Sequence, residues 1–305
     1  MKKLNIITLL MITVCLASCD KEAIPVVEDD PRSSYFMPDP AASDEESVLR
    51  RSFLAEEKSY LLFNDTLRHE FIGVDYNGDR QYRTERVNIG YVLAGTIDGA
   101  YRYTHFLYSS MDEKRAAVDF MKNHVLKDLP VMLRPYSWLV TRQTEVIDPI
   151  GMPSYPTALA GQRSIAIALG NVTTLSAVQK GQLGRQIVAT AVGHKLVSME
   201  QVVNRFYAVS QSLYNTTFPV VTYTDAENIE SLRQRGFIVQ NWFIEGFFML
   251  HGSIPSREKD LESYVSLVFS RTDEEVVAQY AAYPIVIQKY RLLKTIFEEE
   301  GYIQK

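Results

Sequence analysis

The only cysteines of this 305-residue chain are Cys15 and Cys19, and both lie near its start. Everything after Cys19 must therefore fold without a disulfide and without a thiol for catalysis or metal binding. Before Cys19, two lysines precede an apolar run over residues 4–16. A helix needs about 20 apolar residues to span a bilayer, so this run is too short for a membrane span and is typical of a cleaved targeting signal.

Residues 16–19 read Leu-Ala-Ser-Cys, which resembles the lipobox of bacterial lipoprotein signal peptides. The resemblance implies that residues 1–18 are a signal peptide and that Cys19 carries lipid, with several acyl chains giving a stable anchor. Asp20 and Glu22 follow closely and are similar to the surface-export signal of lipoproteins in the Bacteroides group. We therefore expect a lipid-anchored outer-membrane protein on the cell surface, with the periplasmic face as the alternative.

Composition constrains both the partners and the domain organisation. The chain carries 32 basic and 37 acidic residues, a formal net charge of −5 at pH 7. A surface of this sign repels polyanions, which argues against nucleic acid and against electrostatic binding to anionic lipid. Residues 20–47 contain four prolines and many acids but little apolar periodicity. We expect residues 19–47 to be a disordered tether and residues 48–305 to be one folded domain.

The patterns in residues 48–305 change from strands to helices along the chain. A helix is expected over 48–62, and Ser110 with Glu113 makes the capping box of another that extends to about Leu126. Strands are expected over residues 87–93, 131–141 and 164–169. Further helices are expected over residues 181–212, 225–235, 257–270, 273–280 and 284–300. A small sheet followed by a helical C-terminal half indicates an α+β fold.

The helix expected over 181–212 carries the pattern closest to catalytic chemistry. Helical spacing places His194 and Ser198 on one face. In a zinc-peptidase helix, two histidines at this spacing bind the metal, and a glutamate after the first takes a proton from the zinc-bound water. Here Lys195 puts an ammonium in the place of that base, and the Ser198 hydroxyl is a poor zinc ligand. Only the first ligand, His194, is kept.

Segments around this helix are similar to those of the zinc-binding metallopeptidase lipoproteins of the Bacteroides group, a family often associated with glycan uptake. The similar segments lie at residues 156–161 and 164–167 before the helix, and at 235–238, 256–266 and around Lys289 after it. The resemblance covers most of 48–305 and implies a zincin-like scaffold. It also implies an acidic metal ligand in the 256–266 segment, where one alignment selects Glu258 and another leaves Lys259.

The lost residues imply that zinc hydrolysis by the usual mechanism is absent, because His194 and Glu258 are at most two of three ligands and the base is missing. We therefore expect an inactive binding protein, or an accessory of a glycan or nutrient uptake system, without a cofactor. Its expected partners are a glycan, a peptide or an outer-membrane uptake complex. The alternative is an active zinc metallopeptidase with a rearranged site, drawing on His194, on Glu258 or Glu262, and on His251.

Simpler interpretations exist for each of these side chains. A histidine in a helix is most often satisfied by a buried hydrogen bond, which is the plain interpretation of His194. Asp260 and Glu262 are interpreted as a solvated helix face. A further hypothesis pairs Lys195 with one of these two acids in place of the metal.

Three other groups of residues are candidates for binding. The acids at 75–79 match the first oxygen positions of a calcium loop, but Arg80 and Arg86 stand where glycine and glutamate are required, so a hairpin turn is expected. Aromatic residues on two strands either stack on sugar rings or pack in the core. They are Tyr101, Tyr103, His105, Tyr136 and Trp138, and a further apolar cluster contains Trp242, Phe243, Phe247 and Phe248.

Overall fold

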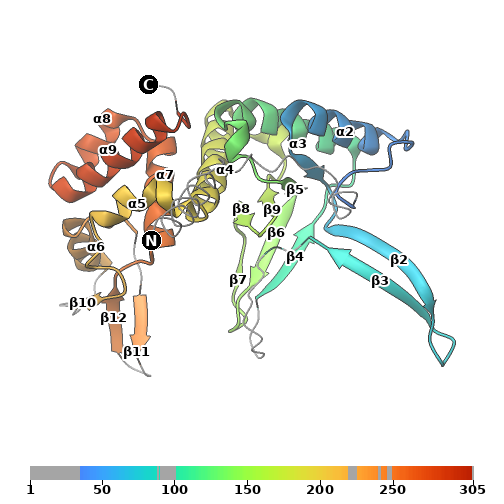
Figure 1. Cartoon of the computed structure of the whole chain (residues 1–305), viewed down its shortest axis with the longest axis horizontal. Helices are drawn as coiled ribbons and strands as arrows, with labels where there is room; N and C mark the ends of the chain where they lie inside the picture. Colours follow the sequence, from blue (N-terminus) through green and yellow to red (C-terminus); the bar gives the residue numbers. More distant parts are fainter. Residues whose placement is uncertain are drawn as a thin grey trace, which may run out of the picture. The chain divides into compact units, whose positions relative to one another are not determined.

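The computed structural model describes residues 35–87, 89, 101–218, 225–239, 242–245 and 249–303. The chain divides into two units, Met1–Tyr35 and Phe36–Lys305, and the helices and strands described below belong to the second (Figure 1). These elements combine several small sheets with a mainly helical C-terminal half, which confirms the expected α+β class. In the described part of the chain, no helix is both long enough and apolar enough to cross a bilayer.

A four-stranded sheet lies at the centre of the N-terminal half. Its strands are, in spatial order, β1 (Tyr60–Leu62), β5 (Ser137–Thr141), β9 (Ser164–Ala168) and β8 (Ala158–Ala160). The first three are parallel, and β8 runs antiparallel at one edge. The strand predicted over 164–169 is confirmed as β9. The strand predicted over 131–141 is shorter, because Val131–Leu133 forms a 3₁₀ turn after Pro130.

The two faces of this sheet are covered by different parts of the chain. Alternation along β5 sends Trp138 and Val140 into the main core and Leu139 to the opposite face. That opposite face is covered in part by Phe36, whose ring lies 5.0 Å from that of Tyr136. The compact unit thus begins at Phe36, earlier than the expected boundary at residue 48.

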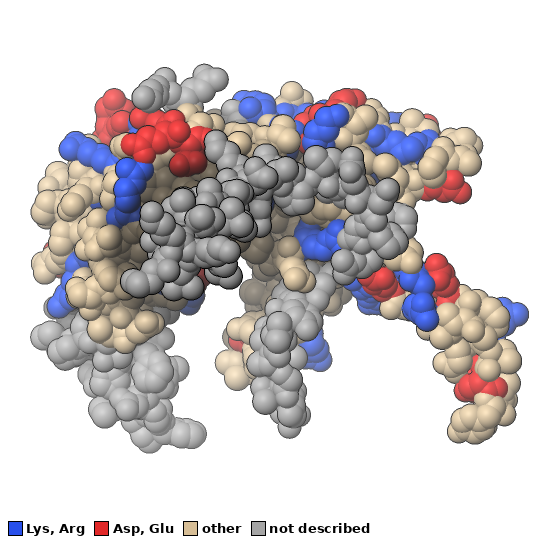
Figure 2. All heavy atoms as spheres, viewed as in Figure 1, with Lys and Arg blue, Asp and Glu red and all other residues tan. Residues whose placement is uncertain are grey.

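Three helices pack along the main core: α2 (Glu45–Glu57), α3 (Met111–His124) and α4 (Ala177–Val197). Ser110 caps α3 as predicted, because its side chain accepts from the Glu113 N–H. The helix predicted over 48–62 starts earlier and ends before β1. Cross-helix ion pairs join α2 to α3, including Lys114–Glu46 at 2.5 Å, and acidic and basic side chains are interspersed on the face seen in Figure 2.

Hairpins extend from this half of the molecule. Strands β2 (Thr66–Val74) and β3 (Arg80–Arg86) are joined by the predicted turn, in which Asp75 Oδ1 accepts from the N–H groups of Asn77 and Asp79. The strand predicted over 87–93 is not present in its described part, since β3 ends at Arg86. A second antiparallel sheet contains β4 (Arg102–Phe106), β6 (Gln143–Ile147) and β7 (Pro153–Ser154).

The C-terminal half is mainly helical, as predicted. The helix expected over 181–212 is instead two helices, α4 and α5 (Glu200–Ala208), separated at Ser198 and Met199. The remaining helices match their predicted ranges closely: α6 (Asp225–Gln234), α7 (Arg257–Ser270), α8 (Asp273–Tyr280) and α9 (Pro284–Glu299). A small sheet of β10 (Thr217–Phe218), β12 (Met249–Ser253) and β11 (Trp242–Glu245) lies between them in sequence.

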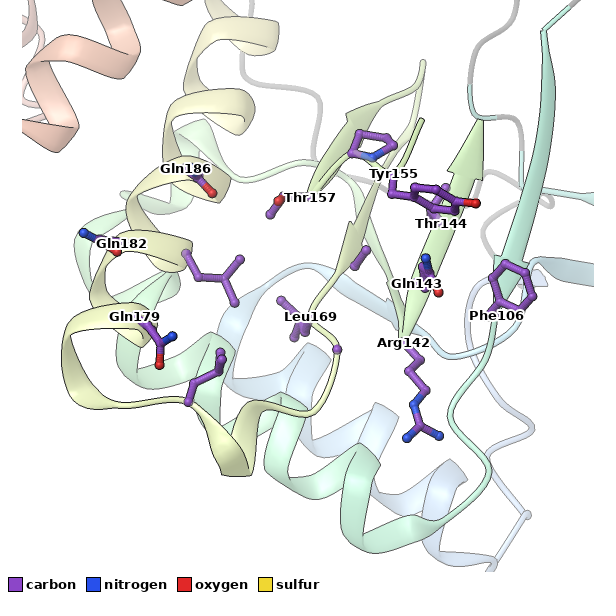
Figure 3. A pocket seen from close by; sticks show the side chains of 15 residues that line it. Phe106, Arg142, Gln143, Thr144, Tyr155, Thr157, Leu169, Gln179, Gln182 and Gln186 are labelled. Carbon is purple, nitrogen blue, oxygen red and sulfur yellow. The ribbon is translucent and has the colours of Figure 1, made fainter. Parts of the chain in front are cut away.

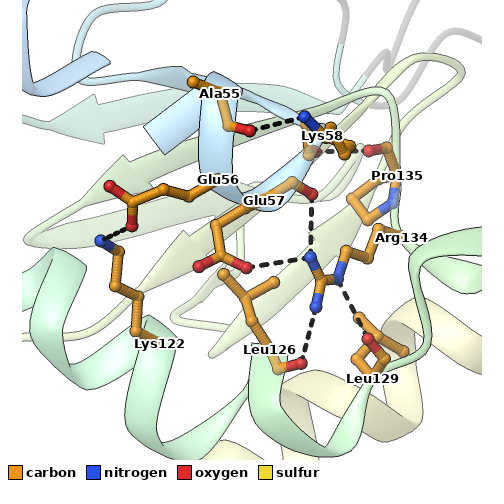
Figure 4. A network of polar contacts seen from close by, with 10 residues as sticks. Ala55, Glu56, Glu57, Lys58, Lys122, Leu126, Leu129, Arg134 and Pro135 are labelled. Carbon is orange, nitrogen blue, oxygen red and sulfur yellow. Dashed lines mark hydrogen bonds and ion pairs between the residues drawn. The ribbon is translucent and has the colours of Figure 1, made fainter. Parts of the chain in front are cut away.

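Arg134, which precedes β5 in the chain, links the central sheet to two helices (Figure 4). Its guanidinium donates to the backbone carbonyls of Glu57, Leu126 and Leu129 at 2.8–3.0 Å. It also pairs with the Glu57 carboxylate at 2.9 Å. One side chain therefore satisfies carbonyls at the end of α2 and beyond the end of α3, where helix ends leave acceptors without an intrahelical partner.

A buried ion pair joins α7 to α9. Lys289 Nζ lies 2.6 Å from Asp260 Oδ2 and 3.0 Å from the Gly236 carbonyl oxygen, and both charged side chains have zero exposure. Tyr214 donates a further hydrogen bond of 2.5 Å to the same carboxylate oxygen. The rings of Phe206, Phe237 and Tyr264 surround the ammonium at 4.6–4.8 Å. Asp260 is therefore a core residue, and its interpretation as a solvated helix face is wrong.

Burial lowers the pKa of Lys289 and raises the pKa of Asp260, while their mutual attraction opposes both shifts. A glycine is required beside them, because Gly236 has φ +82° and a Cβ there would lie 2.4 Å from Ile285 Cγ2. The Gly236 carbonyl accepts from both Lys289 and Tyr264. The cluster thus holds the 236 turn, α7 and α9 in one arrangement.

We expect Lys289→Met to lower the free energy of unfolding by about 3–5 kcal/mol, because it leaves the Asp260 carboxylate buried without its counter-charge. Urea unfolding at pH 7 measures the loss. The matched control is Lys294→Met on the same helix, whose partner Asp273 is half exposed, and which we expect to cost no more than about 1 kcal/mol. The double variant Lys289→Met/Asp260→Asn should recover part of the loss. Equal effects of the two single variants would contradict this account.

Candidate functional site

A groove runs between α4 and the segment 155–160, which includes the edge strand β8. It consists of two cavities, of about 690 Å³ and about 510 Å³, that share Gln186. The larger cavity, here the wide end, lies beside the first half of α4 (Figure 3). The smaller cavity, here the His194 end, lies beside the second half of α4, and His194 and Glu262 line it. The groove therefore follows one helix and one strand edge.

Within the described residues, the backbone of β8 is paired with a strand only on the side of β9. Gly161 N–H donates to Ser164 O, and Ala168 N–H donates to Thr157 O, both at 2.8 Å. In an antiparallel ladder only alternate residues bond to the same neighbour, so the N–H and C=O groups of Ala158 and Ala160 point the other way. Among the described strands, none pairs with β8 on that side. As far as the structure describes the chain, the edge thus offers unpaired backbone donors and acceptors beside the groove.

His194 lies on α4 at the end of the groove and is half buried. A hydrogen bond joins its ring to the backbone of Gly161, which directly follows β8. Burial lowers the pKa of His194, and the Lys195 charge adds to this, while the Gly161 contact opposes it. The ring is therefore neutral at pH 7 and is held by the hydrogen bond that the simpler interpretation proposed for it.

The two residues that replace the zinc-peptidase base and second ligand do not converge with His194. Lys195 and Ser198 are exposed, and the Ser198 hydroxyl donates to the Lys195 carbonyl at 2.7 Å. Ser198 caps the end of α4, which stops at Val197, so its hydroxyl serves the helix terminus. The hypothesis that Lys195 pairs with Asp260 is wrong, because that carboxylate is bonded to Lys289.

The acidic candidates on α7 separate into two environments. Glu258 lies exposed in the first turn of α7, whereas Glu262, one turn later, lines the His194 end of the groove. Within the described residues, no group of three histidine, cysteine or acidic side chains is placed to hold a metal ion. The side chain of His251 lies outside the described residues, as does Cys19. Of the named candidates, the structure brings together His194 and Glu262.

Helix α7 reaches the groove because α4 has a glycine opposite it. A Cβ at Gly193 would lie 3.1 Å from Glu262 Cγ, so the two helices approach closely at this point. Glu262 packs the stem of its side chain against Gly193, while the residue as a whole is exposed. Burial raises the pKa of Glu262, the Glu258 charge raises it further, and Lys259 partly opposes the shift.

The wide end contains residues that sequence reasoning did not single out. Its floor is apolar, with Leu169, Leu175 and Leu183, and its rim carries Gln186 and Tyr155. A signal for the helical wall was present, because residues 179, 182, 183 and 186 follow helical spacing on α4. The opposite wall comes from the strand ends of β6 and β9, which only the tertiary pairing brings next to α4.

The aromatic candidates for sugar stacking are mostly structural. Trp138 is fully buried, and Tyr136 packs against Phe36 and Tyr60. His105 Nδ1 lies 3.0 Å from Thr144 Oγ1 on the neighbouring strand. The side chains of Trp242 and Phe243, and all of Phe247 and Phe248, lie outside the described residues.

No protein-family model, no curated protein and no solved structure matches the chain. The family resemblance of the sequence segments therefore stays a prediction. The groove has to be interpreted from its own residues and contacts.

We expect Glu262→Gln to raise the melting temperature at pH 7 but not at pH 3.5. A carboxyl group with a raised pKa costs the folded state free energy when it ionises, so the wild type loses stability as the pH rises through that pKa. Below the ordinary glutamate value of about 4.3 both proteins carry a neutral side chain and should melt together. Thermal melts from pH 3.5 to 8 measure the difference.

Glu258→Gln is a second variant for the same melting experiment, with a smaller expected effect on the melting temperature. The Glu258 charge is the second cause of the raised pKa of Glu262, so its removal should stabilise the protein in the same direction and by less. A Glu262→Gln variant that melts below the wild type at pH 7 would contradict the assignment of a desolvated carboxylate.

Proposed function

We propose that this protein is an exported, lipid-anchored lipoprotein that has a zincin-like scaffold and binds peptides without hydrolysing them. Three observations support the proposal. Residues 16–19 resemble a lipobox. Segments on both sides of α4 resemble those of zinc-binding metallopeptidase lipoproteins. Helix α4 carries His194 beside an antiparallel edge strand, as a peptidase helix would carry its first ligand.

The absence of hydrolysis follows from the chemistry of the side chains along α4. A general base must sit within reach of the water that it deprotonates, and the exposed side chain of Lys195 stands where a peptidase has its glutamate. The Ser198 hydroxyl donates its hydrogen bond to the Lys195 carbonyl. The alternative of a rearranged zinc site needs a third ligand, and among the described side chains that line the His194 end only His194 and Glu262 are of the ligand type.

The choice of a peptide as the ligand rests on the backbone groups of β8 that are unpaired in the described part of the chain. An extended peptide can add to a free sheet edge through main-chain hydrogen bonds, and pockets beside the edge then select its side chains. Ala158 and Ala160 supply two such positions next to the groove. Their small side chains pack against the main core and leave the edge open. A role as an accessory of an uptake complex is compatible with peptide capture at the cell surface.

The test removes one backbone donor from the edge. Ala160→Pro deletes the outward N–H while sparing the bonds of β8 to β9, because proline is tolerated on the free side of an edge strand. The control Ala160→Val keeps the N–H and adds similar volume. Arrayed random octapeptides supply the probe, and the tightest binder is then measured by calorimetry on each variant. We expect Ala160→Pro to weaken binding about 2–10-fold, as for one hydrogen bond, and Ala160→Val to leave it nearly unchanged.

Other outcomes of this experiment would overturn the proposal. A proline variant that binds as tightly as the wild type would remove the edge from the site. Cleavage of the bound peptide, lost in His194→Ala, would support the metallopeptidase alternative. Binding of oligosaccharides in place of peptides would support the glycan alternative.

The location is tested separately at Cys19. We expect the full chain, expressed in a bacterium that processes lipoproteins, to incorporate labelled palmitate and to sediment with the outer membrane. Cys19→Ser should abolish the label and release the protein from the membrane fraction, because the thiol is the site of lipid attachment. Retention of the label in this variant would contradict the assignment.

A further inference from the structure

We propose that the wide end of the groove is a specificity pocket for an aromatic side chain of the bound peptide. This inference rests on the proposed peptide binding at β8 and goes beyond it by naming the class of peptide. The two cavities share Gln186, and the segment that forms β8 continues backwards into residues 155–157 at the wide end. A peptide on the β8 edge therefore passes the wide end within a few residues.

The size and floor of the wide end fit a large apolar group. The cavity has a volume of about 690 Å³, within the range of pockets that bind ligands. Leu169, Leu175 and Leu183 line it and supply the apolar surface, and Ala168 also lines it with a small side chain. Burial of an apolar side chain against such a floor is the main source of affinity in a pocket of this kind.

The rim favours a ring that carries a polar group over a plain aliphatic chain. Tyr155 and Phe106 line the cavity and are 56% and 45% exposed, so their rings are available to an incoming aromatic group. The amides of Gln143 and Gln186 come from opposite walls and can bond a hydroxyl or an indole N–H (Figure 3). The rim therefore matches tyrosine or tryptophan.

Charge at the wide end disfavours lysine and arginine as the preferred occupants. Among the described residues that line it, Arg142 alone is charged, and its guanidinium lies 3.7 Å from the Glu113 carboxylate. A lysine or arginine would place a second cation beside this guanidinium over an apolar floor.

The direction of β8 sets where the ring lies in the peptide sequence. Antiparallel pairing is slightly more stable per residue than parallel pairing. A peptide that pairs antiparallel to β8 passes Ala160 first, then Ala158, then the wide end. The aromatic residue should therefore lie on the C-terminal side of the residues that pair with Ala158 and Ala160.

The experiment uses the full chain and an alanine-based octapeptide series in which one tryptophan moves through every position. We expect peptides with the tryptophan towards their C-terminal side to bind about tenfold tighter than the all-alanine peptide. Ala168→Leu should remove this gain, because the added side chain fills the floor while the Ala168 N–H still bonds Thr157. Tyr155→Phe is the matched control, which keeps the ring at the rim and should keep the gain.

Failure of this inference is distinguishable from failure of peptide binding. If all peptides of the series bind equally and still respond to Ala160→Pro, the specificity pocket is refuted and the edge site stands. If the tryptophan gain survives in Ala168→Leu, the ring binds elsewhere and the wide end is refuted as its site. If no peptide binds at all, the proposed function itself fails, and the inference with it.

Discussion

The groove depends on the buried contact between Lys289 and Asp260, because that contact determines where α7 lies. Buried ion pairs contribute little net stability, since the cost of desolvating two charges offsets most of their attraction. Their geometry is nevertheless demanding: the ammonium must meet the carboxylate, the Gly236 carbonyl and three rings at once. Together these contacts constrain the placement of α9 against α7.

The position of α7 in turn determines which of its residues line the groove. Asp260 faces inward, so Glu262, two residues later on the helix, faces α4 at the point where Gly193 admits it. Helix α4 in turn lies beside β8 and carries His194 to the backbone after that strand. The buried charge pair thus helps to position Glu262, which lines the His194 end of the groove together with His194.

The sequence predicted the helices of the C-terminal half well because local signals define them. N-cap residues such as Ser256 and Thr272 precede apolar spacing, and Pro284 starts the last helix. The break between α4 and α5 contains neither glycine nor proline. The helical periodicity continues across it, so the sequence predicted one helix where the structure has two. Asp260 was misplaced although it shares a helical stripe with Tyr264 and Leu267, which was a sign that it faces the core.

Less of the candidate site could be predicted, because tertiary pairing creates it. His194 was identified on its helix, but its partner strand β8 is only three residues long and has no pattern of its own. The wide end joins the ends of β6 and β9 to the start of α4, which are distant in sequence. Spacing within a segment cannot report such a contact.

The shortness of β8 also governs how the molecule behaves towards copies of itself. An exposed sheet edge is a template on which a second chain can grow a continuous sheet. Here the edge is limited to Ala158–Ala160, with Pro156 on one side and Gly161, beneath the His194 ring, on the other. Such an edge is long enough to hold a short peptide and too short to propagate a sheet between molecules, so it can stay unpaired without acting as a template for polymerisation.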